Sequence, residues 1–300
     1  MRAGSGTPVV PTEGLPIQEV CSLLDLPAPT IRSWERRYGI PTPDRSTGGH
    51  RRFSHADVTQ LQLMRDEVAR GRRPVDAAAW VAAEVARPLP HQELIDELVG
   101  AAQRLDREEL LGTLASSVAE LGVIATTCDV VLPAIRRIGV AWQAGRCDTA
   151  HEHLATEATL AWMHRVTVTD SGPAGVGVIL LACGPNDHHS LGLEAFALLL
   201  RERGHDVRML GPRVPTASLV TAIEGTRASA TVVVSHLAVA RRAALGSLVA
   251  AGRICPSVYY AGNAFTSRAS RQQVPGTYLG EDFRRATDLV VAELSDLRRA

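Results

Sequence analysis

The spacing of hydrophobic residues divides the chain into three regions. In the first, residues 13–86, apolar positions three or four apart predict helices over 17–24 and 30–37 and a longer third helix ending near residue 69. A tight turn at 25–29 joins the first two helices, and Ser54 and Asp57 have the spacing of a cap for the third. Residues 39–53 bend at Gly48-Gly49 and predict a hairpin. Residues 1–12, rich in Gly, Pro and Thr, are expected to be disordered.

The second region, residues 90–168, keeps a helical period throughout. Its apolar positions predict helices over 91–104, 107–121, 122–145 and 149–167. The turns between these helices are short, which is typical of an antiparallel four-helix bundle. Residues 87–90 (RPLP) predict the boundary with the first region, and the turn-rich residues 170–175 predict the boundary with the third.

The third region, residues 175–300, alternates short Val/Ile runs with Ala/Leu-rich segments. The runs predict strands over 176–183, 207–210, 231–234, 257–260 and 277–279, and the segments between and after them predict helices over 193–202, 217–224, 241–251, 266–272 and 281–297. Continuous apolar runs are typical of buried parallel strands. Five strand–helix units predict a doubly wound parallel sheet, so the whole chain is expected to be a multidomain protein with helical and α/β parts.

Composition excludes several classes of protein. The chain has 300 residues, of which 45% are hydrophobic and 21% charged, as in a globular protein of more than one domain. We find no apolar run of about 18 residues and no apolar leader, and we therefore expect no membrane-spanning helix and no secretory signal. The five cysteines are scattered without a Cys-x-x-Cys pair. This pattern favours reduced thiols in the cytoplasm over a disulfide scaffold or a cysteine zinc site.

Charge is distributed unevenly although the net charge is zero. Residues 32–73 hold ten arginines against five acidic residues, which favours a polyanionic partner for that end. Two short helices joined by a tight turn, the second of them basic, are typical of a helix-turn-helix that binds DNA. Trp34 and Phe53 are expected in the core of this region.

Two motifs in the first region carry a family resemblance. Residues 32–39 (RSWERRYG), followed by residues 48–53 (GGHRRF), resemble the winged DNA-binding domain of the MerR family of transcription regulators. The resemblance implies that the second helix enters the major groove and that the hairpin contacts the neighbouring backbone. By the same resemblance the candidate DNA contacts are Arg32, Arg36, Arg37, Tyr38, Arg45, His50, Arg51 and Arg52. It also implies a dimer or larger oligomer that binds inverted repeats in double-stranded operator DNA.

Three motifs in the third region follow predicted strands, at the edge of the sheet where ligands bind in such folds. Asp187-x-His189-x-x-Gly192 follows the first strand, Ser235-x-Leu237 the third, and Gly262-Asn263 the fourth. In this order they resemble the signature of cobalamin-binding domains, with Asn263 in place of a usual glycine.

The resemblance gives these residues roles towards the cofactor. It implies that His189 is the lower ligand of the cobalt and displaces dimethylbenzimidazole, while Asp187 orients the other ring nitrogen. Gly192 would let the backbone pass close to the corrin tail. Ser235 and residues 262–264 would shape the slot for the displaced base.

The order of the three regions resembles the CarH/LitR family of cobalamin-dependent photoreceptor repressors. Trp142, Glu152 and His153 fit that family's bundle motif. By resemblance they enclose the deoxyadenosyl group above the corrin, which favours adenosylcobalamin over methylcobalamin. The family's members commonly have histidine immediately after the tryptophan, where this chain has Gln143.

The resemblance implies a light-sensing repressor and no enzyme. In darkness a homotetramer would bind operator DNA; light would break the cobalt–carbon bond, dissociate the oligomer and release the DNA. Three alternatives stay open: a sensor of cobalamin concentration, the cobalamin-carrying subunit of an enzyme, and a repressor that has lost its cofactor.

Overall fold

The computed structural model describes residues 14–46, 48–69, 71–86, 90–143, 149–166, 177–266 and 268–297. The chain divides into two compact units, residues 1–110 with 133–155 and residues 111–132 with 156–300. The predicted disordered N-terminus, the predicted linker at 170–175 and most of the boundary at 87–90 lie outside the described residues.

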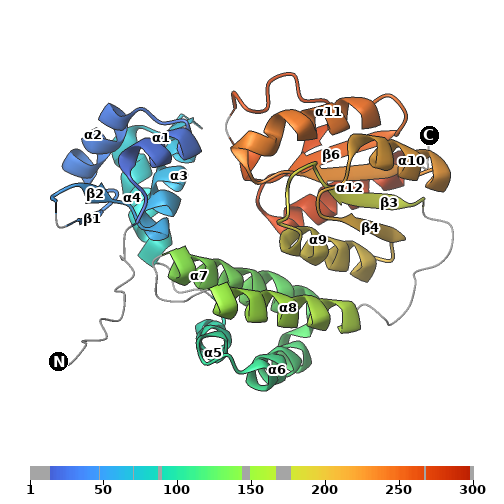
Figure 1. Ribbon diagram of the computed structural model, residues 1–300, viewed down its shortest axis with the longest axis horizontal. Helices are drawn as coiled ribbons and strands as arrows, with labels where there is room; N and C mark the ends of the chain where they lie inside the picture. Colours follow the sequence, from blue (N-terminus) through green and yellow to red (C-terminus); the bar gives the residue numbers. More distant parts are fainter. Residues whose placement is uncertain are drawn as a thin grey trace, which may run out of the picture. The chain divides into compact units, whose positions relative to one another are not determined.

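The N-terminal region is a helical domain with a small hairpin (Figure 1). Its elements are α1 (Ile17–Leu24), α2 (Ala28–Tyr38), β1 (Asp44–Arg45), β2 (Arg51–Arg52), α3 (His55–Ala69) and α4 (Pro74–Ala86). The predicted first and third helices are confirmed. The second begins two residues earlier than expected, since Pro29 is well tolerated in the first turn of a helix. Trp34 and Phe53 lie in the core of this domain, as predicted.

Short-range hydrogen bonds fix the hairpin and the start of α3. β1 and β2 pair in antiparallel register, with Asp44 opposite Arg52. Ser54 and Asp57 form a reciprocal cap: the amide of Ser54 donates to Asp57 Oδ2 at 2.7 Å, and the amide of Asp57 donates to Ser54 Oγ at 3.2 Å. This cap confirms the beginning of the third helix predicted from the sequence.

The middle region is helical, as predicted, but its helices are less regular than the sequence suggested. It contains α5 (Gln92–Gln103), α6 (Arg107–Ala125), the π-helix η1 (Thr126–Val131), α7 (Leu132–Gln143) and α8 (Thr149–Val166). The boundary expected between residues 121 and 122 is a kink inside α6, where Gly122 has φ 77° and ψ 166°. Glycine permits that backbone conformation without strain.

One stretch of this region, Arg107–Gly139, is long and apolar enough to cross a membrane by length and composition, contrary to the expectation from the sequence. Such a stretch is weak support for a membrane span because core helices pass the same test. Ser117, Thr126 and Thr127 along it are buried. Asp129 in it accepts two hydrogen bonds from the guanidinium of Arg284 at 2.7 and 2.6 Å. Buried hydroxyls and an ion pair are typical of a helix packed against protein.

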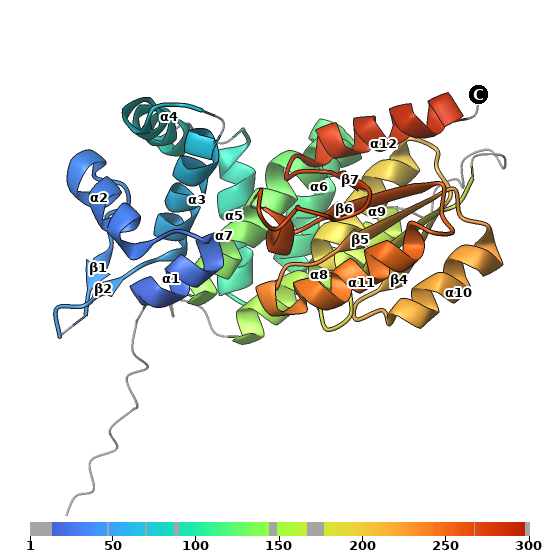
Figure 2. The ribbon, with the colours of Figure 1, turned by 90° about the horizontal axis from the view of Figure 1, so that it is seen from above.

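The C-terminal region is a five-stranded parallel sheet with helices on both faces (Figure 2). The strands are β3 (Ile179–Cys183), β4 (Val207–Gly211), β5 (Ala230–Val234), β6 (Ser257–Ala261) and β7 (Thr277–Tyr278). Helices α9 (Leu191–Glu202) and α12 (Phe283–Leu297) cover one face, and α10 (Thr216–Thr226) and α11 (Arg241–Ala251) cover the other. The predicted doubly wound sheet is confirmed.

One predicted helix of this domain was wrong. The structure has a short 3₁₀ turn, η3 (Asn263–Phe265), instead of a helix near 266–272, whose described residues form turns. The amide of Ala264 donates to the carbonyl oxygen of Ser235 at 3.0 Å, which draws the chain against the end of β5. The remaining helices and strands agree with the sequence to within a few residues.

The strand order positions the candidate site. The order is β4-β3-β5-β6-β7, so the chain leaves β3 to one side and returns on the other side as β5. At such a reversal the loops after the two strands diverge and leave a crevice at the carboxyl edge. The Asp187 loop follows β3 and Ser235 follows β5, which places both motifs at this point.

Candidate functional site

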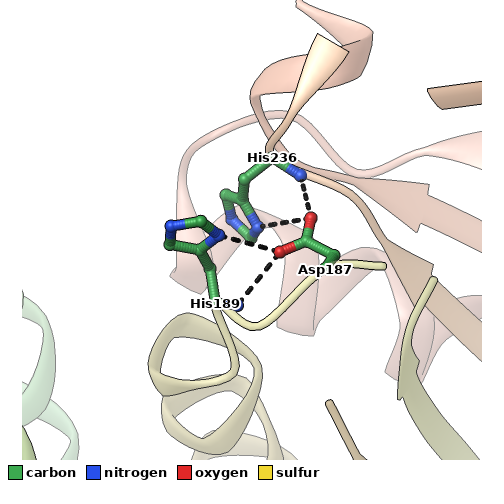
Figure 3. A group of neighbouring side chains, drawn as sticks. All are labelled: Asp187, His189 and His236. Carbon is green, nitrogen blue, oxygen red and sulfur yellow. Dashed lines mark hydrogen bonds and ion pairs between the residues drawn. The ribbon is translucent and has the colours of Figure 1, made fainter. Parts of the chain in front are cut away.

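Asp187 is the centre of the candidate site. It lies in the loop between β3 and α9 and is completely buried. Its Oδ1 accepts hydrogen bonds from the backbone amide of His189 at 3.0 Å and from the ring Nδ1 of His189 at 2.8 Å (Figure 3). The loop is anchored to the sheet, since the amide of Gly184 donates to the carbonyl oxygen of Val234 at 2.8 Å. The predicted Asp187–His189 pair is therefore present.

A second imidazole, which the sequence did not single out, completes the group. The backbone amide of His236 donates to Oδ2 of Asp187, and its ring Nδ1 lies 3.6 Å from the same oxygen. Figure 3 shows both rings turned towards the carboxylate. His236 occupies the variable position of Ser235-x-Leu237, and its only sequence signal was its place directly after a strand at the reversal of the sheet.

The hydrogen bonds decide the charge of Asp187. Burial raises the pKa of its carboxyl group, but the hydrogen bonds from the ring and amide of His189 and from the amide of His236, with the His236 ring close by, outweigh burial and hold the pKa well below the ordinary range. The carboxylate is thus ionised at neutral pH and can only accept. The proton between the two residues therefore resides on Nδ1 of His189, which leaves Nε2 as the ring nitrogen available to a ligand.

This tautomer suits metal ligation. A histidine that ligates a metal through one nitrogen commonly donates its other N–H to a carboxylate, which fixes the ring and raises its basicity. The His189 side chain is 56% exposed although its Asp187 partner is fully buried. Within the described residues, Asp187, His189 and His236 form a group able to hold a metal ion, with ligand atoms within 4.8 Å of one another.

The ends of β5 and β6 form a tight cradle beside this group. Gly262 has φ 100°, and a Cβ there would overlap the carbonyl oxygen of Ser235 and lie 2.8 Å from its carbonyl carbon. Ser235 is completely buried, and its hydroxyl has no hydrogen-bond partner among the described residues. A buried hydroxyl without a partner is costly, and a polar ligand in the crevice would remove that cost.

The other predicted residues of the third region lie at the same edge. A Cβ at Gly192 would meet only Cζ of Phe283, at 3.6 Å, so no crowding within the protein explains the glycine. Leu237 is 38% exposed just beyond β5. Asn263 is exposed at the beginning of η3. Space at residue 192 and exposed side chains at 237 and 263 suit a surface that receives a ligand.

The three predicted bundle residues belong to the first compact unit. Trp142 lies in α7, and its side chain is outside the described part of the structure, as is that of Gln143. Glu152 and His153 are the fourth and fifth residues of α8, with His153 Nε2 3.6 Å from Glu152 Oε2. Their role around an upper ligand remains a prediction.

The candidate DNA contacts divide by exposure. Arg32, Arg36 and Arg37 are exposed on α2, whereas Tyr38 packs against the core. In the hairpin, Arg45 and His50 are exposed and Arg52 is half-buried. Arg45 Nη1 donates to the carbonyl oxygen of Gly49 at 3.2 Å.

Arg51 is the candidate contact whose partner within the protein is clearest. Its Nε donates to Oε2 of Glu35 at 2.7 Å, and this bond ties the hairpin to α2. Arg51 therefore has a structural role, while the three exposed arginines of α2 are better placed for phosphates or bases.

Three family models match the chain. Residues 15–81 match the MerR HTH family regulatory protein model, and residues 94–167 and 177–281 match two B12 binding domain models. The HTH-type transcriptional repressor CarH of Myxococcus xanthus is 32% identical over 214 residues, 66% of this chain and 70% of the relative. The repressor CarA of the same organism is 33% identical over 215 residues, 68% of this chain and 70% of the relative.

A solved structure shares the fold. The Methanosarcina barkeri monomethylamine corrinoid protein has a TM-score of 0.57 at 13% identity, covering 68% of this chain and all of that one. The class defined by the fold and the matches is that of cobalamin-binding, MerR-type transcriptional repressors. The chain belongs to the family of the HTH-type transcriptional repressors CarH and CarA. The predicted MerR-type head, cobalamin-binding domain and family are thereby confirmed.

Proposed function

We propose that the protein is an adenosylcobalamin-dependent, light-responsive transcriptional repressor of the cytoplasm, without enzymatic activity. The observation that carries the cobalamin part is the hydrogen bond from Nδ1 of the exposed His189 to the buried Asp187 at the crevice of the sheet. Membership of the CarH and CarA family supports the repressor part.

The residues of the C-terminal domain fit the cofactor. His189 would ligate the cobalt from below, Asp187 would orient it, and Gly192 would leave room for the tail. The Ser235 hydroxyl, which has no hydrogen-bond partner among the described residues, would gain one, and Leu237, Gly262 and Asn263 would line the slot for the displaced base. When bound, adenosylcobalamin would supply a cobalt–carbon bond that visible light breaks.

The middle region would respond to the upper ligand. Trp142, Glu152 and His153 would hold the adenosyl group in darkness, and the chain would then form a tetramer that binds operator DNA. Loss of the adenosyl group would remove the packing partner of Trp142 and shift the balance of oligomers. Four linked DNA-binding domains bind DNA far more tightly than one or two, so dissociation of the tetramer would release the operator.

Gln143 would alter the state after illumination. An amide is a poorer ligand for cobalt(III) than an imidazole, so water, or a histidine elsewhere in the chain, would complete the coordination. We expect the corrin of the light state to exchange for fresh adenosylcobalamin more readily than a corrin held by two imidazole ligands.

The test is size-exclusion chromatography of protein purified in darkness with adenosylcobalamin, before and after green light, with absorbance of the corrin recorded. We expect a large oligomer that carries the corrin absorbance in darkness and a smaller species after illumination. An oligomer that forms with cobalamin but ignores light would overturn the light response and favour a sensor of cobalamin concentration. Protein that does not retain the corrin would overturn both.

A further inference from the structure

The Asp187 carboxylate is shared by two histidines, and the proposed function uses only one of them. Oδ1 serves His189, whose amide and Nδ1 both donate to it. Oδ2 serves His236, whose backbone amide donates to it and whose Nδ1 lies 3.6 Å away. The two rings lie 5.5 Å apart between centroids, tilted by 52°.

The His236 ring lies against the Asp187 carboxylate. Its Nδ1 is buried and forms no hydrogen bond within the described residues, and Oδ2 of Asp187 lies 3.6 Å from it. The side chain as a whole is only 26% exposed, against 56% for His189. The more buried ring therefore lies on the protein side of the carboxylate and the more exposed ring on the side open to a ligand.

We propose that His236 is a positioning residue for His189, acting through the Asp187 carboxylate that both histidines share. The inference rests on the proposed role of His189 as the lower cobalt ligand. The Nδ1 of His236 faces Oδ2 at 3.6 Å and in this way restrains rotation of the carboxylate. A carboxylate fixed in this way holds the His189 ring in one orientation and one tautomer.

Sequence position explains why this arrangement is possible. β3 and β5 are neighbours, with Cys183 opposite Val234 at their carboxyl ends. The loop after β3 brings Asp187 back over the first residues after β5, and His236 is the second of these. A histidine at the variable position of the Ser235-x-Leu237 motif thus reaches a carboxylate that lies 49 residues earlier in the chain.

Two substitutions separate the polar contact from the volume of the ring. His236→Asn places an amide nitrogen where Nδ1 lies and keeps a donor towards Oδ2. His236→Phe keeps a ring of similar size and removes the nitrogen. The backbone amide that bonds Oδ2 is present in both variants. His188→Asn is the matched control, because His188 is an exposed neighbour outside the Asp187 group.

The first measurement is the affinity for adenosylcobalamin, by titration with the visible spectrum as readout. Loss of a group that orients a metal ligand typically costs about 10–100-fold in affinity. We expect a loss of this size in His236→Phe, with His236→Asn and His188→Asn close to the unchanged chain. Equal losses in His236→Phe and His236→Asn, or no loss in either, overturn the proposal.

The second measurement needs no cofactor. Nitrogen-15 correlation spectra of the imidazole rings report the tautomer of His189 in the cofactor-free protein. We expect one Nδ1–H tautomer in the unchanged chain and in His236→Asn, and a mixture in His236→Phe. A single Nδ1–H tautomer in His236→Phe contradicts the positioning role. If His189→Ala binds adenosylcobalamin with an unchanged spectrum, the ligand role of His189 fails instead, and the tautomer result still decides the role of His236.

Discussion

Replacement of Gly262 by alanine tests the cradle at the end of β6. Gly262 has φ 100° and ψ 163°, a conformation that is almost confined to glycine and costs other residues about 1–3 kcal/mol. The added Cβ would also overlap the backbone of Ser235, lying 2.8 Å from its carbonyl carbon. Relief of such an overlap costs roughly another 1–3 kcal/mol. The expected destabilisation is therefore about 2–6 kcal/mol.

Gly211→Ala is the matched control. Gly211 ends β4 with φ 85°, and nothing lies within 4 Å of a Cβ built on it. It carries only the cost of the left-handed backbone, about 1–2 kcal/mol. For a protein of this size, 1 kcal/mol shifts Tm by about 2–4 °C.

Thermal melting of the C-terminal domain, followed by circular dichroism, compares the two variants. We expect Gly262→Ala to melt several degrees below Gly211→Ala and to lose cobalamin binding, because the carbonyl of Ser235 must move. Equal melting temperatures and equal cobalamin binding would refute the close packing of β5 against the turn after β6.

Three further outcomes are expected. Arg36→Ala should remove a phosphate contact, so operator binding should weaken by a similar factor for different DNA sequences. The slope of log binding constant against log salt concentration should fall by about 1, and an unchanged slope would exclude the phosphate contact. Arg284→Ala should cost no more than about 1 kcal/mol in urea unfolding, since both partners of the Asp129–Arg284 pair are partly exposed; exchange of the two residues should recover part of that loss. Burial raises the pKa of the Cys183 thiol to about 12. Its labelling by a disulfide reagent should therefore be slow at pH 8 and become faster as the pH rises. Rapid labelling of the folded protein at pH 8 would show that the thiol is not buried. The neutral thiol stabilises the fold below its ordinary pKa, and this contribution is lost as pH rises towards about 12.

The regular parts of the fold were predictable because local patterns specify them. The strand and helix order of the C-terminal domain followed from apolar runs separated by turn residues, and the cap at Ser54 and Asp57 followed from their spacing. The Asp187–His189 pair was predictable because the two residues are neighbours in one loop.

The rest depended on contacts between distant segments. His236 joins Asp187 only because β3 and β5 are neighbours in the sheet, and no local pattern gives that neighbour relation. The helix predicted near 266–272 is absent from the described residues of that segment, where the guanidinium of Arg241, 29 residues earlier, bonds the carbonyl oxygen of Ser270. The kink at Gly122 and the π-helix after it likewise break a helical pattern that the apolar spacing alone would continue.

The most direct test of cobalt ligation by His189 is the visible spectrum of adenosylcobalamin mixed in darkness with the unchanged protein, compared with the spectrum in the presence of His189→Ala. We expect the unchanged chain to displace the benzimidazole and shift the spectrum, with saturation at one cofactor per chain, and His189→Ala not to produce this shift. The same shifted spectrum in both proteins would contradict the assignment of His189 as the cobalt ligand held by Asp187.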